Sequence, residues 1–217
     1  MAPMTARAAE ALRWIEATPE SPRLEGRYGA LQPGAAAVVA PPHPEYGGHM
    51  DHPVVDALVA GLAGGGLATL RFNWRGAGRS GGGITGEPSA ARADYAAAFA
   101  QLAQLHPGPY LATGYSFGAA TALAVAARDT RLTRLVLVGP PAGLLPRELL
   151  DVFTGDALVI VGDDDHYAPL ARIRPILAPH PRFRLEVIAG ADHFFATGGV
   201  ERIAPLVTAF VRSGSET

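Results

Sequence analysis

Short, continuously apolar runs alternate with longer stretches of helical periodicity along this chain. Runs that are apolar at every position are typical of strands buried on both faces, as in a parallel sheet. The stretch 89–105 has the clearest helical pattern, because Tyr95, Phe99, Leu102 and Leu105 recur at intervals of three and four. This alternation predicts an α/β fold, a doubly wound and mostly parallel sheet with helices on both faces. The expected strands are 24–28, 35–40, 68–73, 110–114, 135–138, 157–161 and 184–188, and the expected helices are 54–62, 89–105, 117–127, 170–177 and 200–212.

The length of 217 residues suits one domain with a sizeable core. No linker rich in serine, glycine or proline divides the chain, so we expect a single domain over residues 1–217. A leader at 1–13 and a tail at 213–217 are its candidate flexible ends. The segment between the strands that end at 138 and begin at 157 is short, so we expect no large cap domain.

The composition excludes several classes of function. There is no cysteine, which rules out disulfides, thiolate metal sites and cysteine nucleophiles. The net charge of −2 gives no electrostatic reason to expect nucleic acid or an anionic membrane as a partner. The sequence shows neither a secretory signal nor an apolar run of the ~18 residues that a membrane span needs. We therefore expect a cytoplasmic protein that acts on a small molecule, and its oligomeric state is open.

A G-x-S-x-G pattern lies near the middle of the chain, where residues 114–118 read G-Y-S-F-G. An apolar run at 110–113 precedes it and an alanine-rich helical run at 119–127 follows it. Strand, sharp turn and helix form the context in which this pattern marks a nucleophilic serine. The two glycines let the strand and the helix approach each other without Cβ clashes. Ser116 is therefore the candidate nucleophile.

Two later strands end in loops that carry carboxylates and histidines. Residues 162–166 read G-D-D-D-H after one expected strand, and residues 189–193 read A-G-A-D-H after the last. A serine nucleophile needs a general base, and the base needs a carboxylate that orients it. Because sites in parallel sheets form at the carboxyl ends of strands, Ser116, one of these aspartates and His193 are expected to meet at one edge.

Acyl transfer also needs hydrogen-bond donors for the oxyanion. One usual donor is the amide just after the nucleophile, here that of Phe117. The other comes from the loop after an early strand, here 41–48, in which Pro44 has no N–H and the amide of Glu45 is the better donor. The candidate pocket side chains are His43, Tyr46, Trp74 and Tyr115, with packing an equal reading for Trp74 and Tyr46.

Two other patterns invite different functions. Residues 76–81 fit G-x-G-x-x-G, but residues 82–88 are too rich in glycine and proline to open the helix that a dinucleotide site requires. Histidines and an aspartate cluster at 43–52, yet they lack the helical spacing of a zinc site. We therefore expect no metal and no cofactor, and we expect His52 or Asp51 to cap the following helix.

Five blocks together resemble the α/β-hydrolase superfamily, and within it a small, lidless bacterial group of serine hydrolases related to dienelactone hydrolases and carboxylesterases. Residues 41–52 read P-P-H-P-E-Y-G-G-H-M-D-H, similar to H-P-H-P-L-Y-G-G-T-M-D-N in that group. Residues 71–81 read R-F-N-W-R-G-A-G-R-S-G, similar to its R-F-N-F-R-G-V-G-x-S-x-G block. Three further blocks complete the resemblance, which spans about 14–212. They are residues 114–118, the G-x-x-D block at 162–165 and H-F-F at 193–195.

The resemblance favours Asp165 as the acid, because Asp165 fills the last position of G-x-x-D, and Asp164 is its main rival. The early loop departs from the group at two positions, where Pro41 replaces a histidine and Glu45 replaces an apolar residue. A carboxylate at position 45 disfavours anionic acyl groups unless it faces solvent.

The activity that the residues and the resemblance imply is that of a serine hydrolase acting on carboxylic esters or thioesters. Ser116 attacks, His193 moves the proton, Asp165 orients the imidazole, and an acyl-enzyme forms on Ser116. Acyl transfer or another non-hydrolytic reaction with the same residues is the alternative among enzymes. A binding protein that kept the fold without catalysis is the alternative of a different class.

Overall fold

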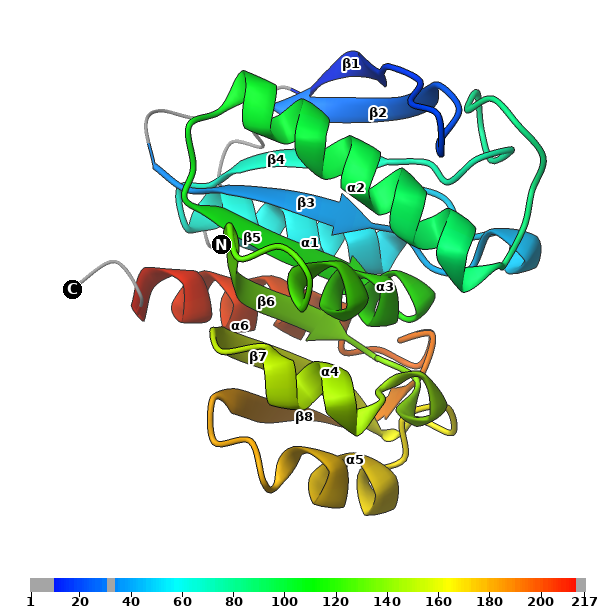
Figure 1. Cartoon of the computed structure of the whole chain (residues 1–217). Coiled ribbons are helices and arrows are strands. Elements are labelled where there is room, and N and C mark those ends of the chain that lie inside the picture. The colour runs from blue at the N-terminus through cyan, green and yellow to red at the C-terminus, as the bar shows by residue number, and fades with distance from the viewer. Residues whose placement is uncertain (1–9, 31–33, 214–217) are drawn as a thin grey trace.

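The computed structural model describes residues 10–30 and 34–213, which form an eight-stranded sheet with helices on both faces (Figure 1). The strand order is β1-β2-β4-β3-β5-β6-β7-β8. Strand β2 runs antiparallel to both of its neighbours, and every other neighbouring pair is parallel. The predicted fold class is confirmed. The strands are β1 (Glu10–Ile15), β2 (Leu24–Gly29), β3 (Ala36–Ala40), β4 (Ala68–Phe72), β5 (Tyr110–Tyr115), β6 (Leu132–Val138), β7 (Asp156–Asp164) and β8 (Phe183–Asp192).

The helices form a layer on each face of the sheet (Figure 1). Helices α1 and α6 pack together on one face, and α2 to α5 cover the other. Successive strand residues supply opposite layers, so that Val38 joins the core under α2 and α3 and Val39 joins the core under α1 and α6. The helices are α1 (Pro53–Gly64), α2 (Pro88–Leu105), α3 (Phe117–Ala126), α4 (Arg147–Val152), α5 (Leu170–Leu177) and α6 (Val200–Ser213), with short 3₁₀ turns η1 (Pro44–Tyr46) and η2 (Ala142–Leu144).

The first strand departs from the prediction. Residues 10–13, assigned to a leader in the sequence analysis, belong to β1, and the rest of the leader and residues 214–217 of the tail lie outside the described residues. The carboxylate of Glu10 pairs at 2.5 Å with the buried guanidinium of Arg71 in β4. Arg71 also pairs with Asp56 of α1 at 2.7 Å, so this edge of the sheet is joined to the helix layer by charge pairs.

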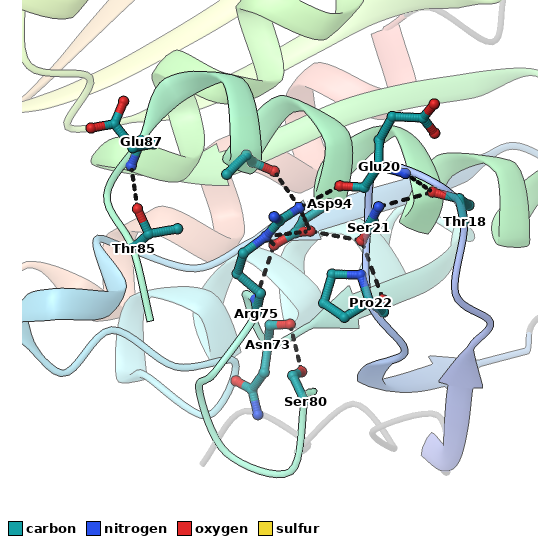
Figure 2. A network of polar contacts seen from close by, with 11 residues as sticks. Thr18, Glu20, Ser21, Pro22, Asn73, Arg75, Ser80, Thr85, Glu87 and Asp94 are labelled. Atoms are coloured by element: carbon teal, nitrogen blue, oxygen red, sulfur yellow. Dashed lines mark hydrogen bonds and ion pairs between the residues drawn. The ribbon is translucent and has the colours of Figure 1, made fainter. Parts of the chain in front are cut away.

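A buried polar network fixes the loop that follows β4 (Figure 2). Asp94 of α2 is fully buried and accepts hydrogen bonds from the backbone N of Arg75 at 2.9 Å and from its guanidinium Nη2 at 2.7 Å. The hydroxyl of Ser21, between β1 and β2, donates to the same carboxylate at 2.7 Å. Three segments distant in the sequence are therefore held together, and the loop after β4 has a defined path.

None of the helices in the described part of the chain combines the length and apolar character that crossing a membrane requires. Helix α6 is strongly amphipathic, with Ile203, Val207 and Phe210 buried against α1 and the sheet. Its other face carries charged residues, as is usual for a helix that covers a sheet. The cytoplasmic location expected from the sequence stays a prediction.

Candidate active site

The turn between β5 and α3 holds Ser116 in a strained conformation. Its φ of 54° and ψ of −118° lie outside the regions that residues with a side chain favour. The backbone N of Ser116 donates to Val138 O of β6 at 2.8 Å, which anchors the turn to the neighbouring strand. A Cβ on Gly114 would collide with the backbone of Gly118, so this turn needs the first glycine of the motif. Strain held by packing of this kind is common at functional sites.

His193 follows the carboxyl end of β8 and contacts the serine. Its Nε2 lies 2.9 Å from Ser116 Oγ, and its side chain is almost entirely buried. Two residues further on, Phe195 also has a positive φ, 55°, and its ring is buried in the core under α1 and α6. The buried Phe195 anchors the turn that presents His193 to the serine.

Asp165 completes a hydrogen-bonded chain. Its Oδ2 lies 2.8 Å from His193 Nδ1, and its Oδ1 accepts the backbone N–H groups of Tyr167 and Ala168, each at 2.8 Å. A carboxylate only accepts, so Nδ1 carries the imidazole hydrogen and Nε2 is left to accept from the Ser116 hydroxyl. The carboxylate is buried, and its two oxygens bind an imidazole and two amides.

The neighbouring aspartates do not contact the imidazole. Asp164, the main rival in the sequence, is exposed at the end of β7. Asp163 accepts the backbone N–H of Gly190 at 2.7 Å, and Asp192 accepts that of Ala196 at 2.9 Å. The structure therefore brings Ser116, His193 and Asp165 together, whereas Asp163 and Asp192 accept backbone amides and Asp164 is exposed.

The early loop lies against the serine turn. A Cβ on Gly118 would stand 2.5 Å from Pro41 O, so the second glycine of the motif permits this approach. The indole Nε1 of Trp74 donates to Pro41 O at 3.2 Å and to Pro42 O at 3.0 Å, which fixes the loop just before η1. Phe117 begins α3 and Glu45 belongs to η1, so both candidate oxyanion amides are at helix starts, where amides lack acceptors within the helix.

The candidate pocket side chains divide into exposed and buried ones. Tyr46 is 87 % exposed, and its ring centroid lies 4.8 Å from that of His43. His43 in turn contacts the ring of Phe117 at 4.6 Å. Trp74 is buried under the early loop, packed edge-on against Phe117, so packing is the reading that the structure supports for it. The carboxylate of Glu45 is exposed, where solvent screens its charge.

Tyr115 does not line an open pocket, because it is buried beside His193. Its hydroxyl donates to the backbone O of His193 at 2.9 Å, linking the residue before the serine to the histidine turn. Burial raises the pKa of the Tyr115 hydroxyl, and the nearby carboxylates of Asp165 and Asp192 raise it further, so the hydroxyl stays protonated and able to donate.

The early histidine cluster has structural partners. His52 caps α1 by accepting the backbone N–H of Val54 at 3.2 Å, as predicted. Asp51 pairs with Arg27 at 2.6 Å, and His49 Nδ1 accepts the backbone N–H of Asp51. Partial burial lowers the pKa of His52, and the nearby histidines His49 and His193 lower it further. In the described residues, no three His, Asp or Glu side chains gather in a group that could hold a metal ion.

Two residues at the site are not predicted from the sequence. Gly139, at the end of β6, has a φ of 52°, and a Cβ there would stand 3.4 Å from His193 Cε1 and 3.5 Å from Asp165 Oδ2. Its place at a strand end on the same sheet edge was the available signal. Tyr167 lies with its ring centroid 4.6 Å from that of His193, and only its closeness to Asp165 in the sequence pointed to it.

Comparisons with known proteins agree with this architecture. Residues 45–155 match the sequence model of the serine aminopeptidase S33 family. An uncharacterized protein of Rickettsia prowazekii is 30% identical over an alignment of 186 residues that covers 80% of this chain and 78% of that protein. A putative α/β-hydrolase of unknown function from Agrobacterium tumefaciens is 26% identical, with 96% of this chain and 98% of that chain covered and a TM-score of 0.83.

A further solved structure is that of a hydrolase without a lid. A lidless α/β serine hydrolase from Xanthomonas campestris has a TM-score of 0.78 at 24% identity, with 96% of both chains covered. In the described chain, the connection between β6 and β7 likewise holds only η2 and the short helix α4 (Figure 1). Residues 10–30 and 34–213 include no large lid, and the chain belongs to the serine aminopeptidase S33 family of α/β-hydrolases.

Proposed function

We propose that this protein is a serine hydrolase that cleaves carboxylic esters or thioesters through an acyl-enzyme on Ser116. The observation that carries the proposal is the unbroken hydrogen-bonded chain from Ser116 Oγ to His193 Nε2 at 2.9 Å and from His193 Nδ1 to Asp165 at 2.8 Å. A buried carboxylate, an imidazole of fixed tautomer and a strained serine supply the groups that nucleophilic acyl transfer needs.

In the first half-reaction, Ser116 Oγ attacks the acyl carbonyl carbon while its proton moves to His193 Nε2. The imidazolium that forms is stabilised by the Asp165 carboxylate. The carbonyl oxygen becomes an oxyanion, and we assign the amides of Phe117 and Glu45 to bind it. Collapse of the tetrahedral intermediate breaks the bond to the alcohol or thiol, which takes the proton from His193 Nε2.

In the second half-reaction, water replaces the leaving group. His193 Nε2 removes a proton from the water as its oxygen attacks the acyl carbon. Collapse then releases the carboxylic acid and returns the proton to Ser116 Oγ. Because the part of the chain that the structure describes forms no large lid over the site, we expect activity on short, water-soluble esters and no activation at a lipid interface.

Two structural relatives with names linked to ester chemistry share the fold of this chain. An esterase of Pyrococcus furiosus shares the fold at a TM-score of 0.77 and 16% identity. The protein Est1E of Butyrivibrio proteoclasticus, solved with bound ferulic acid, shares it at a TM-score of 0.81 and 16% identity. At such identities the likeness is one of fold, so the choice of ester or thioester rests on the chemistry of the site.

The proposal is tested with a fluorophosphonate probe and a panel of nitrophenyl esters. We expect one probe adduct on Ser116 in the native chain and none in Ser116→Ala. The control is Ser80→Ala, because the Ser80 hydroxyl is committed to Asn73 O at 2.9 Å and to the amide of Glu25 at 2.9 Å. A native chain that neither reacts with the probe nor cleaves any ester would leave the non-catalytic binding protein as the better reading.

Hydrolysis is separated from acyl transfer by adding an alcohol acceptor during turnover. An open site with free access to water is expected to give mainly the carboxylic acid. If the acyl group passes mainly to millimolar alcohol in the presence of bulk water, the protein is an acyltransferase that uses the same residues.

A further inference from the structure

Two exposed aromatic rings flank the imidazole of His193. Tyr167 is 57 % exposed and Phe194 is 58 % exposed, so more than half of each side chain is open to solvent beside the imidazole. The ring centroid of Tyr167 lies 4.6 Å from that of His193, and the ring of Phe194 meets the imidazole edge-on at 5.3 Å. The two rings also pack edge-on against each other, with their centroids 6.2 Å apart. Together Tyr167 and Phe194 form what we call the aromatic pair.

The backbone fixes the aromatic pair in place. Tyr167 donates its N–H to Asp165 Oδ1 at 2.8 Å and accepts at its O from the Ala142 amide at 2.9 Å. Phe194 lies between His193 and Phe195, and the buried Phe195 with its positive φ turns the neighbouring ring outward. The carboxylate that contacts the imidazole thus also holds the backbone of Tyr167 beside it. A surface held this way needs little ordering when a ligand binds.

The position of the aromatic pair determines which part of a substrate it can meet. In the proposed mechanism, His193 Nε2 must deliver its proton to the departing oxygen or sulfur, so the leaving group lies against the imidazole. The acyl oxygen points the other way, toward the amides of Phe117 and Glu45. Rings that touch the imidazole are therefore next to the alcohol or thiol part of the substrate.

We propose that the aromatic pair of Tyr167 and Phe194 is a leaving-group subsite that favours esters whose alcohol part carries an aromatic ring. This inference rests on the proposed function and names its substrate class. A flat ring in the leaving group packs edge-to-face or offset against the two side chains. Contacts between aromatic rings contribute beyond the apolar area they bury, an advantage of about two- to tenfold in rate.

The test compares benzyl acetate with cyclohexylmethyl acetate. Both substrates have the same acyl group and a primary alcohol of similar size, and they differ in the aromaticity of the leaving group. We expect kcat/KM of the native chain to be about two- to tenfold higher for benzyl acetate. Tyr167→Leu and Phe194→Leu keep apolar surface but remove a ring, and each should bring the ratio toward one. Thermal unfolding checks that both variants remain folded.

Two controls locate the effect. The ratio for methyl phenylacetate over methyl cyclohexylacetate, which places the same difference in the acyl group, should not change in either variant. Tyr46→Leu removes an even more exposed ring, whose centroid lies 4.8 Å from that of His43, and it should not change the leaving-group ratio.

The outcomes separate this inference from the proposed function. If the chain cleaves both acetates equally well, or if the leucine variants change the acyl ratio instead, the subsite is wrong while the hydrolase stands. If Tyr46→Leu lowers the leaving-group ratio as much as Tyr167→Leu, the specific role of the aromatic pair is overturned. A chain that cleaves neither acetate and takes no probe on Ser116 overturns both proposals.

Discussion

Two buried aspartates each belong to a hydrogen-bonded group that contains a serine, and only one group is suited to chemistry. Asp94 binds the guanidinium of Arg75 and the hydroxyl of Ser21 between three segments of the fold (Figure 2). Asp165 binds the imidazole of His193, which in turn meets Ser116 at the carboxyl edge of the sheet. Burial and a carboxylate are common to both groups, so neither feature alone marks an active site.

The difference lies in the group between the carboxylate and the serine. A guanidinium does not release its proton in proteins, and Ser21 donates directly to a carboxylate that is already an ion-pair partner. An imidazole exchanges its proton near neutral pH, and its free Nε2 can take the hydrogen of Ser116. Ser116 also has a strained backbone. Among the described non-glycine residues, only Ser116 and Phe195 have a positive φ, and Ser21 does not share this strain.

The largest expected difference is in kcat, when the serine hydroxyl of each group is removed in a separate variant. In Ser116→Ala, kcat should fall by about 10⁴- to 10⁶-fold, because the nucleophile is lost and only binding and the oxyanion donors remain. In Ser21→Ala, kcat should stay near that of the native chain, while the free energy of unfolding falls by about 1 to 3 kcal/mol. Ester turnover and urea unfolding of the two variants measure this contrast. Equal losses of activity would contradict the distinction between a catalytic Ser116 and a structural Ser21.

Next in size is the effect of neutralising the acid. Asp165→Asn should lower kcat by about 10⁴-fold, because an amide no longer selects the tautomer that leaves Nε2 free. Asp164→Asn, one residue earlier and exposed, should leave kcat within about twofold, since its carboxylate does not touch the imidazole. Steady-state rates on a nitrophenyl ester decide between them. A greater loss in Asp164→Asn would move the acid to the rival position.

Breaking the structural group should affect stability and leave the chemistry intact. Asp94→Asn leaves the mostly buried guanidinium of Arg75 without its charge partner, and we expect the free energy of unfolding to fall by about 3 to 5 kcal/mol. The folded protein should keep its kcat. The matched control is Asp129→Asn, whose partner Arg131 is exposed, where a loss below about 1 kcal/mol is expected. Urea unfolding that showed equal losses would contradict the account of the network.

The smallest effect concerns His52, the cap of α1 near the histidine of the site. Burial and neighbouring histidines lower its pKa below the ordinary 6.5, so the unfolded chain takes up a proton that the folded protein resists. The free energy of unfolding should therefore decrease as the pH falls below about 6.5. His52→Asn keeps a capping side chain without a titrating group and should show a shallower decrease. Unfolding curves at several pH values measure it, and an unchanged slope would exclude this contribution.

Much of the fold could be predicted because its strands are buried on both faces. Helix α5 has the bounds expected from its pattern, and the central strands differ from expectation by a few residues at their ends. Strand β1 is not predicted because E-A-L-R-W-I is interrupted by two charged residues and forms no continuous apolar run. Pairing with β2 and the ion pair of Glu10 with Arg71 hold this strand in place. Contacts between distant segments of this kind leave no local signal in the sequence.

The sequence could predict which strand ends carry the residues of the candidate site. Chain order and the parallel sheet pointed to Ser116, His193 and a carboxylate after β7, and the resemblance favoured Asp165 over Asp164. The hydroxyl contact of Tyr115 and the ring of Tyr167 depend on how two turns fold against the imidazole, which no spacing rule describes. Trp74 was ambiguous because only the fold decides whether an indole faces solvent or the underside of a loop.

The most direct test of the central claim is to trap the acyl-enzyme. The native chain is mixed with nitrophenyl acetate, quenched in acid during turnover, digested and mapped by mass spectrometry. We expect an acetyl group on the peptide that carries Ser116, and we expect none when Ser116→Ala is treated in the same way. Continued turnover with no acetylated serine, or with the acetyl group on another residue, would contradict it.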